Sequence, residues 1–280
     1  MSLQGFSFEG KRVVVTGAAS GMGRAAAELL VEDGAEVHAL DIQRTGVPVH
    51  ASYEVDLRDS SAIKDFASSL PSSIDVLANF AGLANLPDPV DVARVNFIGL
   101  RRLSEEIIPR MPRGSAIGNV ASKSGGYWPS ALDEILPLLE IDDDEKAANW
   151  FASHARMADK YGFTKACVVV YTLARAAELA PQGIRMNAIS PGASDTGFFG
   201  TMNPLENPSL LRSISHVGRM SEPAEQAYPL LFLCSDAASY VSGVNLIVDA
   251  GAQGGYITGR LEAPDLPPYQ GIRRPPAQFA

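Results

Sequence analysis

Short apolar runs alternate along the chain with longer stretches in which apolar residues recur every three or four positions. The short runs have the length of buried strands, and the longer stretches have the periodicity of helices that pack on a sheet. Strands are predicted at residues 12–16, 35–40, 49–55, 74–79, 115–121, 184–189 and 245–248. Helices are predicted at residues 21–33, 60–69, 90–108, 159–179 and 223–233. Continuous apolar strands separated by helices indicate an α/β fold with a single doubly wound parallel sheet.

Two stretches depart from this alternation. Residues 127–158 lie between the fifth strand and the next helix, where α/β units usually use about 2 to 6 residues, so they are expected to form an insertion. Within it, the acidic run at residues 142–145 precedes a helical pattern and is interpreted as the solvated first turn of a helix. From residue 255 onward, repeated prolines exclude a helix or a central strand. We therefore expect one domain over residues 1–254 and an extended or disordered tail over residues 255–280.

Composition and charge exclude several classes of protein. The 280 residues are 46% hydrophobic, which suffices for a full core. Lys and Arg number 23 against 32 Asp and Glu, and the resulting charge of −9 argues against a nucleic-acid partner. The apolar runs fall short of the about 18 to 20 residues that cross a membrane, which argues against a membrane partner. With no leader pattern at the N-terminus, the expected location is the cytoplasm.

The cysteines and histidines predict no metal site. The two cysteines, Cys167 and Cys234, lie in apolar surroundings without metal or redox spacing, as expected of reduced thiols. The histidines are scattered without ligand-like spacing, at His38, His50, His154 and His216.

A glycine-rich segment joins the first predicted strand to the first predicted helix. Its three glycines permit a tight turn, close approach of the backbone to a pyrophosphate and close packing of the helix, whose first N–H groups are free to bind an anion. This is the arrangement of a dinucleotide-binding Rossmann fold. The residues expected to bind the cofactor here are Gly17, Ser20, Gly21, Met22 and Gly23.

An acidic residue ends the second predicted strand. Asp41 lies about 20 residues beyond the glycine-rich segment, where an acid is expected to bind the adenosine ribose hydroxyls. Its charge would repel a 2′-phosphate, and Ser20 places no basic side chain in the loop, so NAD is the expected cofactor. Arg44 lies close enough in the sequence to keep NADP as an alternative.

A tyrosine and a lysine form the strongest candidate for catalysis. Tyr161 and Lys165 are four residues apart on a predicted helix, so their side chains share one face. A nearby cation favours the ionised form of a phenol and lowers its pKa from about 10, which suits a general acid or base. Ser122 follows the fifth predicted strand, at the edge of the sheet where ligands of parallel sheets bind.

Together these motifs resemble those of the short-chain dehydrogenase/reductase family. The similarity rests on the glycine spacing G-x-x-x-G-x-G, the segment Asn79-Phe80-Ala81-Gly82, the Tyr161–Lys165 pair, and Pro191-Gly192 followed by Thr196. It spans roughly residues 11–251. Two positions depart from the family pattern, because Phe80 replaces a second Asn and Ser194 replaces a residue that is often apolar.

The resemblance implies roles for individual residues. Ser122 would bind the substrate oxygen, with Ser124 as the competing assignment, and Asn96 would hold a water that relays protons. Lys165 would bind the nicotinamide ribose and lower the pKa of Tyr161. The other implied cofactor contacts are Asp56, Leu57, Asn79, Ala81, Gly82, Pro191, Gly192 and Thr196.

The long insertion resembles that of the bacterial 3α-hydroxysteroid dehydrogenase/carbonyl reductase branch and of the related coniferyl-alcohol dehydrogenases. The resemblance implies an NAD-dependent enzyme that interconverts a secondary alcohol and a ketone on a bulky apolar substrate. An aromatic alcohol is the alternative substrate, and a non-catalytic NAD-binding regulator is the alternative class. The expected walls of an apolar pocket, each also compatible with ordinary core packing, are Tyr127, Trp128, Phe198, Phe199 and Met202.

A homodimer or homotetramer is expected. Association through the fourth and fifth helices is common in the family, and the insertion is expected to obstruct it. The predicted interface of a dimer is therefore the last strand with the helix at residues 223–233.

Overall fold

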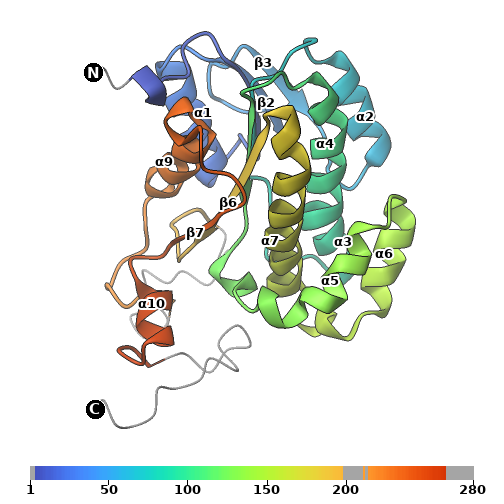
Figure 1. Ribbon diagram of the computed structural model, residues 1–280, viewed down its shortest axis with the longest axis vertical. Coiled ribbons are helices and arrows are strands. Elements are labelled where there is room, and N and C mark those ends of the chain that lie inside the picture. Colours follow the sequence, from blue (N-terminus) through green and yellow to red (C-terminus); the bar gives the residue numbers. More distant parts are fainter. Residues whose placement is uncertain (1–3, 198–210, 212–213, 263–280) are drawn as a thin grey trace.

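The chain folds around one sheet of parallel strands in the order β3-β2-β1-β4-β5-β6-β7 (Figure 1). The computed structural model describes residues 4–197, 211 and 214–262. Its strands are β1 (Arg12–Thr16), β2 (Glu36–Asp41), β3 (Ala51–Glu54), β4 (Val76–Asn79), β5 (Ala116–Val120), β6 (Arg185–Pro191) and β7 (Asn245–Val248). Every predicted strand is present with ends shifted by a few residues, and the order confirms the doubly wound sheet. It reverses between β1 and β4, the switch point beside which ligands of such sheets bind.

Helices cover both faces of the sheet and bury a separate apolar core on each (Figure 1). On one face α1 packs against α9, and on the other α2, α4 and α7 lie over the strands. The helices are α1 (Gly21–Glu32), α2 (Ser60–Ser69), α3 (Pro89–Ala93), α4 (Leu100–Ile107), α5 (Leu132–Leu139), α6 (Asp144–Ser153), α7 (Lys160–Leu179), α9 (Pro223–Cys234) and α10 (Ala252–Ile257). Burial on both faces explains why the central strands read as continuous apolar runs.

The helix predicted at residues 90–108 is interrupted. Between α3 and α4 the chain forms a π-helical segment, Arg94–Gly99, in which every residue after Arg94 is buried. Close packing accounts for it, because a Cβ atom at Gly99 would lie 2.2 Å from the backbone oxygen of Leu57. Widened turns of this kind occur frequently at functional sites, and Asn96 lies in this one.

The insertion forms α5 and α6, which pack beside the lower part of α7 and α3 (Figure 1). The helical pattern after the acidic run corresponds to α6, whereas α5 is short and contains Pro137. The interpretation of the run as solvated was wrong for Asp144, whose side chain is only 9% exposed. Asp144 binds Arg102 of α4 and Ser60 of α2, so the acid anchors the insertion to the domain.

The start of the proline-rich tail differs from the expectation. Residues 252–257 form α10, where the sequence predicts extended or disordered chain from residue 255. Tyr256 is buried there and Leu261 packs against the helix, which gives this short segment an apolar anchor. Residues 263–280 lie outside the described residues. Within the described part of the chain, no helix is long and apolar enough to cross a membrane.

Candidate active site

The turn between β1 and α1 is shaped to admit a dinucleotide. Gly17 and Gly21 have positive φ angles of 70° and 53°, a conformation that side chains disfavour. A Cβ atom at Gly23 would lie 2.2 Å from the backbone oxygen of Gly17. Only glycine therefore fits this loop, and the start of α1 stays open for a pyrophosphate.

A cavity of about 890 Å³ opens beside this loop at the switch point of the sheet. Most of the cofactor contacts implied by the sequence line it, namely Gly17, Ser20, Gly21, Met22, Gly23, Asp41, Asp56, Leu57, Ala81, Gly82 and Thr196. Its walls combine apolar area with free backbone groups, so the residues present fit a nicotinamide dinucleotide.

Besides Tyr161 and Lys165, which are described below with Ser122, three of the residues expected to bind the cofactor do not line this cavity. Asn79 is buried in the sheet, where it donates a hydrogen bond to Asn119 on the neighbouring strand β5 at 2.9 Å. This agrees with a supporting role beside the cofactor. Gly192 lies in a separate cavity of about 240 Å³, and Pro191 ends β6 in its register with Val248. Neither lines the larger cavity among the described residues.

Asp41 is held beside the glycine-rich loop. Its Oδ2 atom accepts a hydrogen bond from the backbone N–H of Ala19 at 3.0 Å, and its Oδ1 atom accepts one from Gln43 at 3.1 Å. The carboxylate therefore has a fixed place at the end of β2. Arg44 is exposed and is not among the described residues that line the cavity.

Asp56, which lines the cavity, forms an ion pair. Its carboxylate accepts hydrogen bonds from the Arg58 guanidinium, and Arg58 also reaches Asp91 at 3.2 Å. The hydrogen bonds from Arg58 outweigh burial and lower the pKa of Asp56. The Asp56 carboxylate therefore has a fixed position at the cavity.

Ser122, Tyr161 and Lys165 converge at the carboxyl end of β5. The turn after Ser122 packs tightly on α7, since a Cβ atom at Gly125 would lie 2.6 Å from the backbone nitrogen of Ala166. This contact brings Ser122 into a hydrogen bond with Tyr161. The competing residue, Ser124, instead donates its backbone N–H to the Ser122 hydroxyl at 3.1 Å. The geometry therefore favours Ser122 as the partner of Tyr161.

The Tyr161 phenol has a raised pKa, opposite to the expectation. Burial raises the pKa of Tyr161 to about 12, although the hydrogen bond with Ser122 opposes this shift. Burial also lowers the pKa of Lys165 to about 8. The Lys165 ammonium donates a hydrogen bond to the backbone oxygen of Val120 at 2.8 Å, which holds it at the carboxyl end of β5.

Asn96 joins this group from the π-helical segment. It is fully buried, and its Oδ1 atom accepts a hydrogen bond from the Leu83 N–H at 2.9 Å while its Nδ2 atom donates to the Leu83 oxygen at 2.9 Å. A Cβ atom at Gly82 would lie 3.0 Å from the Lys165 Nζ atom and 3.3 Å from the Asn96 Oδ1 atom. The absence of a side chain at Gly82 thus keeps Asn96 and Lys165 close together.

The sequence analysis missed Asp159, which begins α7. Its Oδ1 atom accepts a hydrogen bond from the Gly162 N–H at 3.1 Å, and its Oδ2 atom accepts one from the Tyr127 hydroxyl at 3.2 Å. Its charge contributes to the raised pKa of Tyr161. An Asp before a helix is a recognisable capping signal that could have identified it.

The expected pocket walls are only partly described. Tyr127 and Trp128 are partly buried and pack against the core on the α7 side of the sheet. Phe198, Phe199 and Met202 lie outside the described residues.

The sequence matches family models over most of its length. A model described as short chain dehydrogenase matches residues 11–131, and one described as enoyl-(acyl carrier protein) reductase matches residues 151–253. Fold, glycine-rich loop and the Ser–Tyr–Lys group agree with these matches. The chain belongs to the short-chain dehydrogenase family of oxidoreductases, which use nicotinamide cofactors.

Two curated relatives are similar to this chain over most of its length. The chain is 30% identical to a coniferyl-alcohol dehydrogenase of Pseudomonas sp. strain HR199, over 88% of this chain and 98% of the relative. It is 29% identical to a 3-alpha-hydroxysteroid dehydrogenase/carbonyl reductase of Comamonas testosteroni, over 85% of this chain and 95% of the relative. Both relatives bear the names of the two groups that the sequence resembles.

A solved structure shares the fold. The 3-alpha-hydroxysteroid dehydrogenase from Pseudomonas sp. B-0831, crystallised with NADH, superposes with a TM-score of 0.76 at 24% identity. The match covers 90% of this chain and 100% of that one.

Proposed function

We propose that the protein is an NAD-dependent dehydrogenase that interconverts a secondary alcohol and a ketone on a bulky apolar substrate, with a 3α-hydroxysteroid as the leading candidate. The observation that carries this proposal is the meeting of Ser122, Tyr161 and Lys165 beside a cavity fitted to a dinucleotide. A coniferyl-type aromatic alcohol is the second candidate, because a relative with that name is 30% identical.

The chain's own residues account for proton transfer. A bound nicotinamide supplies hydride in reduction and accepts it in oxidation. In reduction, Ser122 orients the carbonyl oxygen and the Tyr161 hydroxyl donates a proton to it; in oxidation, the Tyr161 phenolate accepts the hydroxyl proton. Lys165 holds the nicotinamide ribose and Asn96 holds a water that connects the site with solvent.

The raised pKa of Tyr161 affects ketone reduction and alcohol oxidation differently. A neutral phenol is ready to donate a proton at neutral pH, whereas oxidation needs the ionised form. Lys165 would hold the nicotinamide ribose of a bound dinucleotide, and its positive charge near the phenol would favour ionisation of Tyr161 during turnover.

NAD is the proposed cofactor. Asp41 has a fixed place at the cavity, where its negative charge opposes a 2′-phosphate. Arg44, the cation that would favour NADP, is exposed.

A substrate panel tests the proposal. Steroid, aromatic and small cyclic alcohols are compared by kcat/KM with NAD, and formation of the reduced cofactor is followed by absorbance. The proposal expects a 3α-hydroxysteroid to lead, and an aromatic alcohol in first place would favour the second candidate. Failure of every alcohol and ketone despite tight NADH binding would support a non-catalytic regulator.

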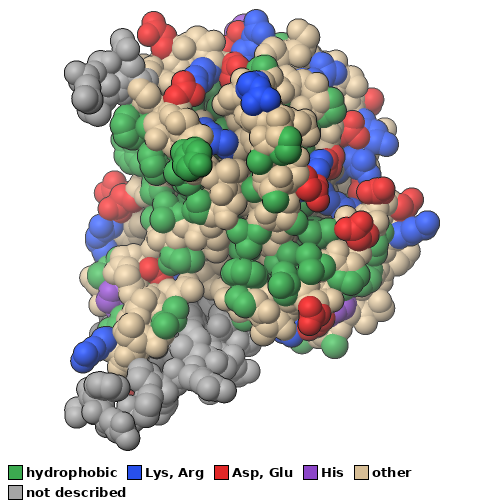
Figure 2. Space-filling model, in the orientation of Figure 1, with side chains coloured by type: hydrophobic (Ala, Val, Ile, Leu, Met, Phe, Trp, Pro, Cys, Tyr) green, Lys and Arg blue, Asp and Glu red, His purple; other side chains and the backbone are tan. Residues whose placement is uncertain are grey.

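We also propose a homodimer formed through α9 and β7. Apolar side chains gather over α9 at the left of Figure 2, and Tyr228, Phe232 and Leu246 are exposed there and on β7. The insertion packs on α7 and binds α4, so it occupies the helices that the alternative interface needs. Light scattering tests this arrangement, and a monomer or a tetramer assembled through α4 and α7 would contradict it.

A further inference from the structure

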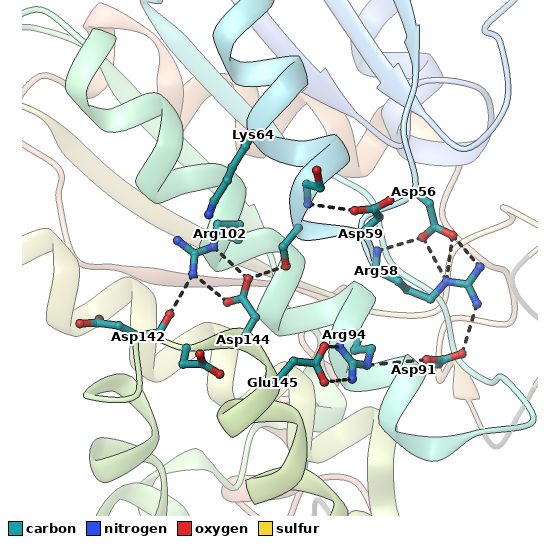
Figure 3. Close-up of a pocket in the computed structure, with 13 residues that line it drawn as sticks. Asp56, Arg58, Asp59, Lys64, Asp91, Arg94, Arg102, Asp142, Asp144 and Glu145 are labelled. Carbon is teal, nitrogen blue, oxygen red and sulfur yellow. Dashed lines mark hydrogen bonds and ion pairs between the residues drawn. The ribbon is translucent and has the colours of Figure 1, made fainter.

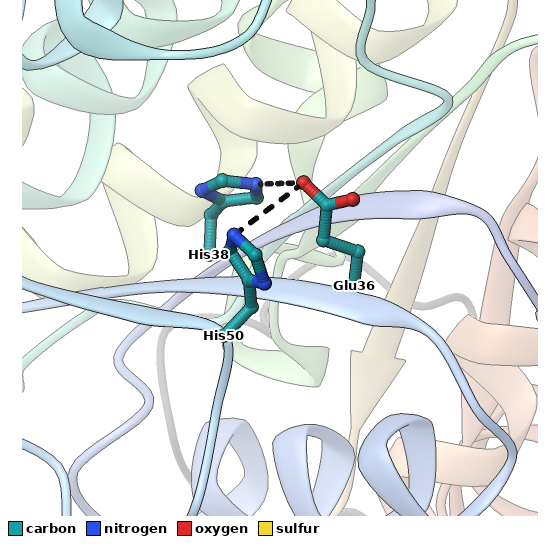
Figure 4. A group of neighbouring side chains, drawn as sticks. All are labelled: Glu36, His38 and His50. Carbon is teal, nitrogen blue, oxygen red and sulfur yellow. Dashed lines mark hydrogen bonds and ion pairs between the residues drawn. The ribbon is translucent and has the colours of Figure 1, made fainter.

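Two histidines and a glutamate that are separate in the sequence meet at the amino end of β2 (Figure 4). The Glu36 Oε1 atom lies 3.1 Å from the His38 Nε2 atom and 3.8 Å from the His50 Nε2 atom. The potential ligand atoms of all three residues lie within 4.8 Å of one another. The spacing of the histidines along the chain does not indicate this cluster, because they are scattered in the sequence.

The parallel pairing of β2 and β3 produces the cluster. Glu36 and His38 are two residues apart on β2, so their side chains project from the same face of the sheet. His38 is in register with Ala51, the first residue of β3, and His50 directly precedes it. The parallel pairing of β2 with β3 therefore brings the three side chains together.

The distances suit a tetrahedral metal ion. With zinc–ligand bonds of about 2.1 Å, neighbouring ligand atoms in a tetrahedron are about 3.4 Å apart. The two measured distances, 3.1 and 3.8 Å, lie on either side of this value. His50 is 58% exposed in its side chain, so its ring has room to adjust and the fourth position faces solvent.

We propose that Glu36, His38 and His50 form a binding site for a divalent transition-metal ion of the zinc class, with water as the fourth ligand. Two imidazole nitrogens and a carboxylate are donors that zinc prefers. The site is distinct from the proposed active site, because it lies at the amino end of β2, whereas Asp41 at the carboxyl end faces the cofactor cavity.

Burial fixes the direction of one potential ligand atom. The His38 ring is only 2% exposed, and it makes its polar contact through Nε2, the atom that faces Glu36 and His50.

The surroundings of the cluster include one cation. Arg12 lies with its Nε atom 3.5 Å from the Glu36 Oε2 atom, the carboxylate oxygen that is not shared with the histidines. It therefore orients the carboxylate and leaves Oε1 for the metal. Tyr53 stacks on the His38 ring with centroids 6.2 Å apart and restrains the ring.

A metal ion bound here would link the end of the segment between β2 and β3 to strand β2. Residues 42–50 connect the two strands, and within them Thr45 donates a hydrogen bond to the Ala18 oxygen of the glycine-rich loop at 2.8 Å. A bond from His50 to β2 would fix the far end of the segment. We expect metal binding to stabilise the fold, with little effect on turnover.

The test uses the full chain without a histidine tag, freed of metal with a chelator and then dialysed. Titration with Zn²⁺ by calorimetry and with Co²⁺ by visible absorption should show one ion per chain, with the intense bands of tetrahedral Co²⁺. Zn²⁺ should also raise the Tm by a few degrees. His50→Ala and Glu36→Gln should each weaken binding at least about tenfold and remove the shift in Tm.

The matched control is His216→Ala, which removes an exposed histidine elsewhere. It should bind and be stabilised as the wild type. Weak or non-stoichiometric binding to the wild type would overturn the proposal, as would unchanged affinity in both cluster variants. Loss of binding in His154→Ala, whose histidine pairs with Glu134, would also overturn it by locating the ion there.

Discussion

Replacement of Asp144 by Asn should destabilise the protein through loss of one buried charge. Asp144 is 9% exposed and lies between α2 and α4 (Figure 3). It accepts hydrogen bonds from the Ser60 hydroxyl at 2.5 Å and from Arg102 at 2.9 and 3.1 Å. Arg101 lies 3.9 Å away. Burial alone would raise the pKa of Asp144, but the hydrogen bonds from Arg102 and Ser60 outweigh it and lower the pKa.

The magnitude follows from these contacts. Removing one partner of a buried ion pair costs about 3 to 5 kcal/mol, and a hydrogen bond to a charged group contributes about 1.5 to 3 kcal/mol. Asn keeps the shape of Asp. Arg102 is 22% exposed and has other acceptors, so its charge is not left without a partner. We therefore expect the free energy of unfolding to fall by about 3 kcal/mol, the low end of this range. In a chain of 280 residues, with an unfolding entropy of about 2.1 cal/mol/K per residue, that corresponds to a fall in Tm of about 5 °C.

The assay is thermal and denaturant unfolding of Asp144→Asn beside Asp142→Asn. Asp142 is an exposed member of the same acidic run, so its replacement should change stability by no more than about 0.5 kcal/mol. Because the folded pKa of Asp144 is depressed, its contribution is complete above about pH 4 and is lost as the pH falls further. Equal stabilities of the two variants at neutral pH would refute the reasoning.

Three further predictions concern the proposed site. Gly23→Ala should weaken NADH binding at least about tenfold in a fluorescence titration, since its Cβ atom would overlap the Gly17 oxygen. Gly46→Ala is the control and should leave the affinity unchanged, because a Cβ atom at Gly46 meets open space. Equal affinities of the two variants for NADH would contradict this prediction. Asp41→Ala should shift the kcat/KM ratio towards NADP at least about tenfold, and an unchanged ratio would count against the assigned role. Because the pKa of Tyr161 is raised, alcohol oxidation should accelerate from about pH 7 to pH 10 while ketone reduction does not; a flat oxidation profile would disagree.

The sheet and the glycine-rich loop were predictable because local sequence determines them. The buried parallel strands β1 and β4 contain the continuous apolar runs 13–15 and 76–78, and the loop needs glycine at positions where the backbone or a neighbour leaves no space. The spacing of Tyr161 and Lys165 likewise fixes a shared helix face, and Ser122 is fixed by the end of its strand. The sheet, the loop and the positions of Ser122, Tyr161 and Lys165 therefore depend on local sequence or on the order of the strands.

Features that depend on contacts between distant segments were not predictable. The charge of Asp144 appeared solvated because Ser60 and Arg102 approach it only in the folded chain. The pKa of Tyr161 was expected to fall, but helix spacing does not report burial, which raises it. His38 and His50 meet only through the pairing of β2 with β3.

The central claim is that the Tyr161 hydroxyl transfers the proton in a reaction at a bound dinucleotide. Tyr161→Phe removes one oxygen atom and keeps the ring. Measured side by side, its kcat/KM for the best substrate of the panel should fall by about 10² to 10⁴-fold, while its dissociation constant for NADH stays within about threefold of the wild-type value. Turnover within tenfold of the wild type, with NADH bound normally, would contradict the claim.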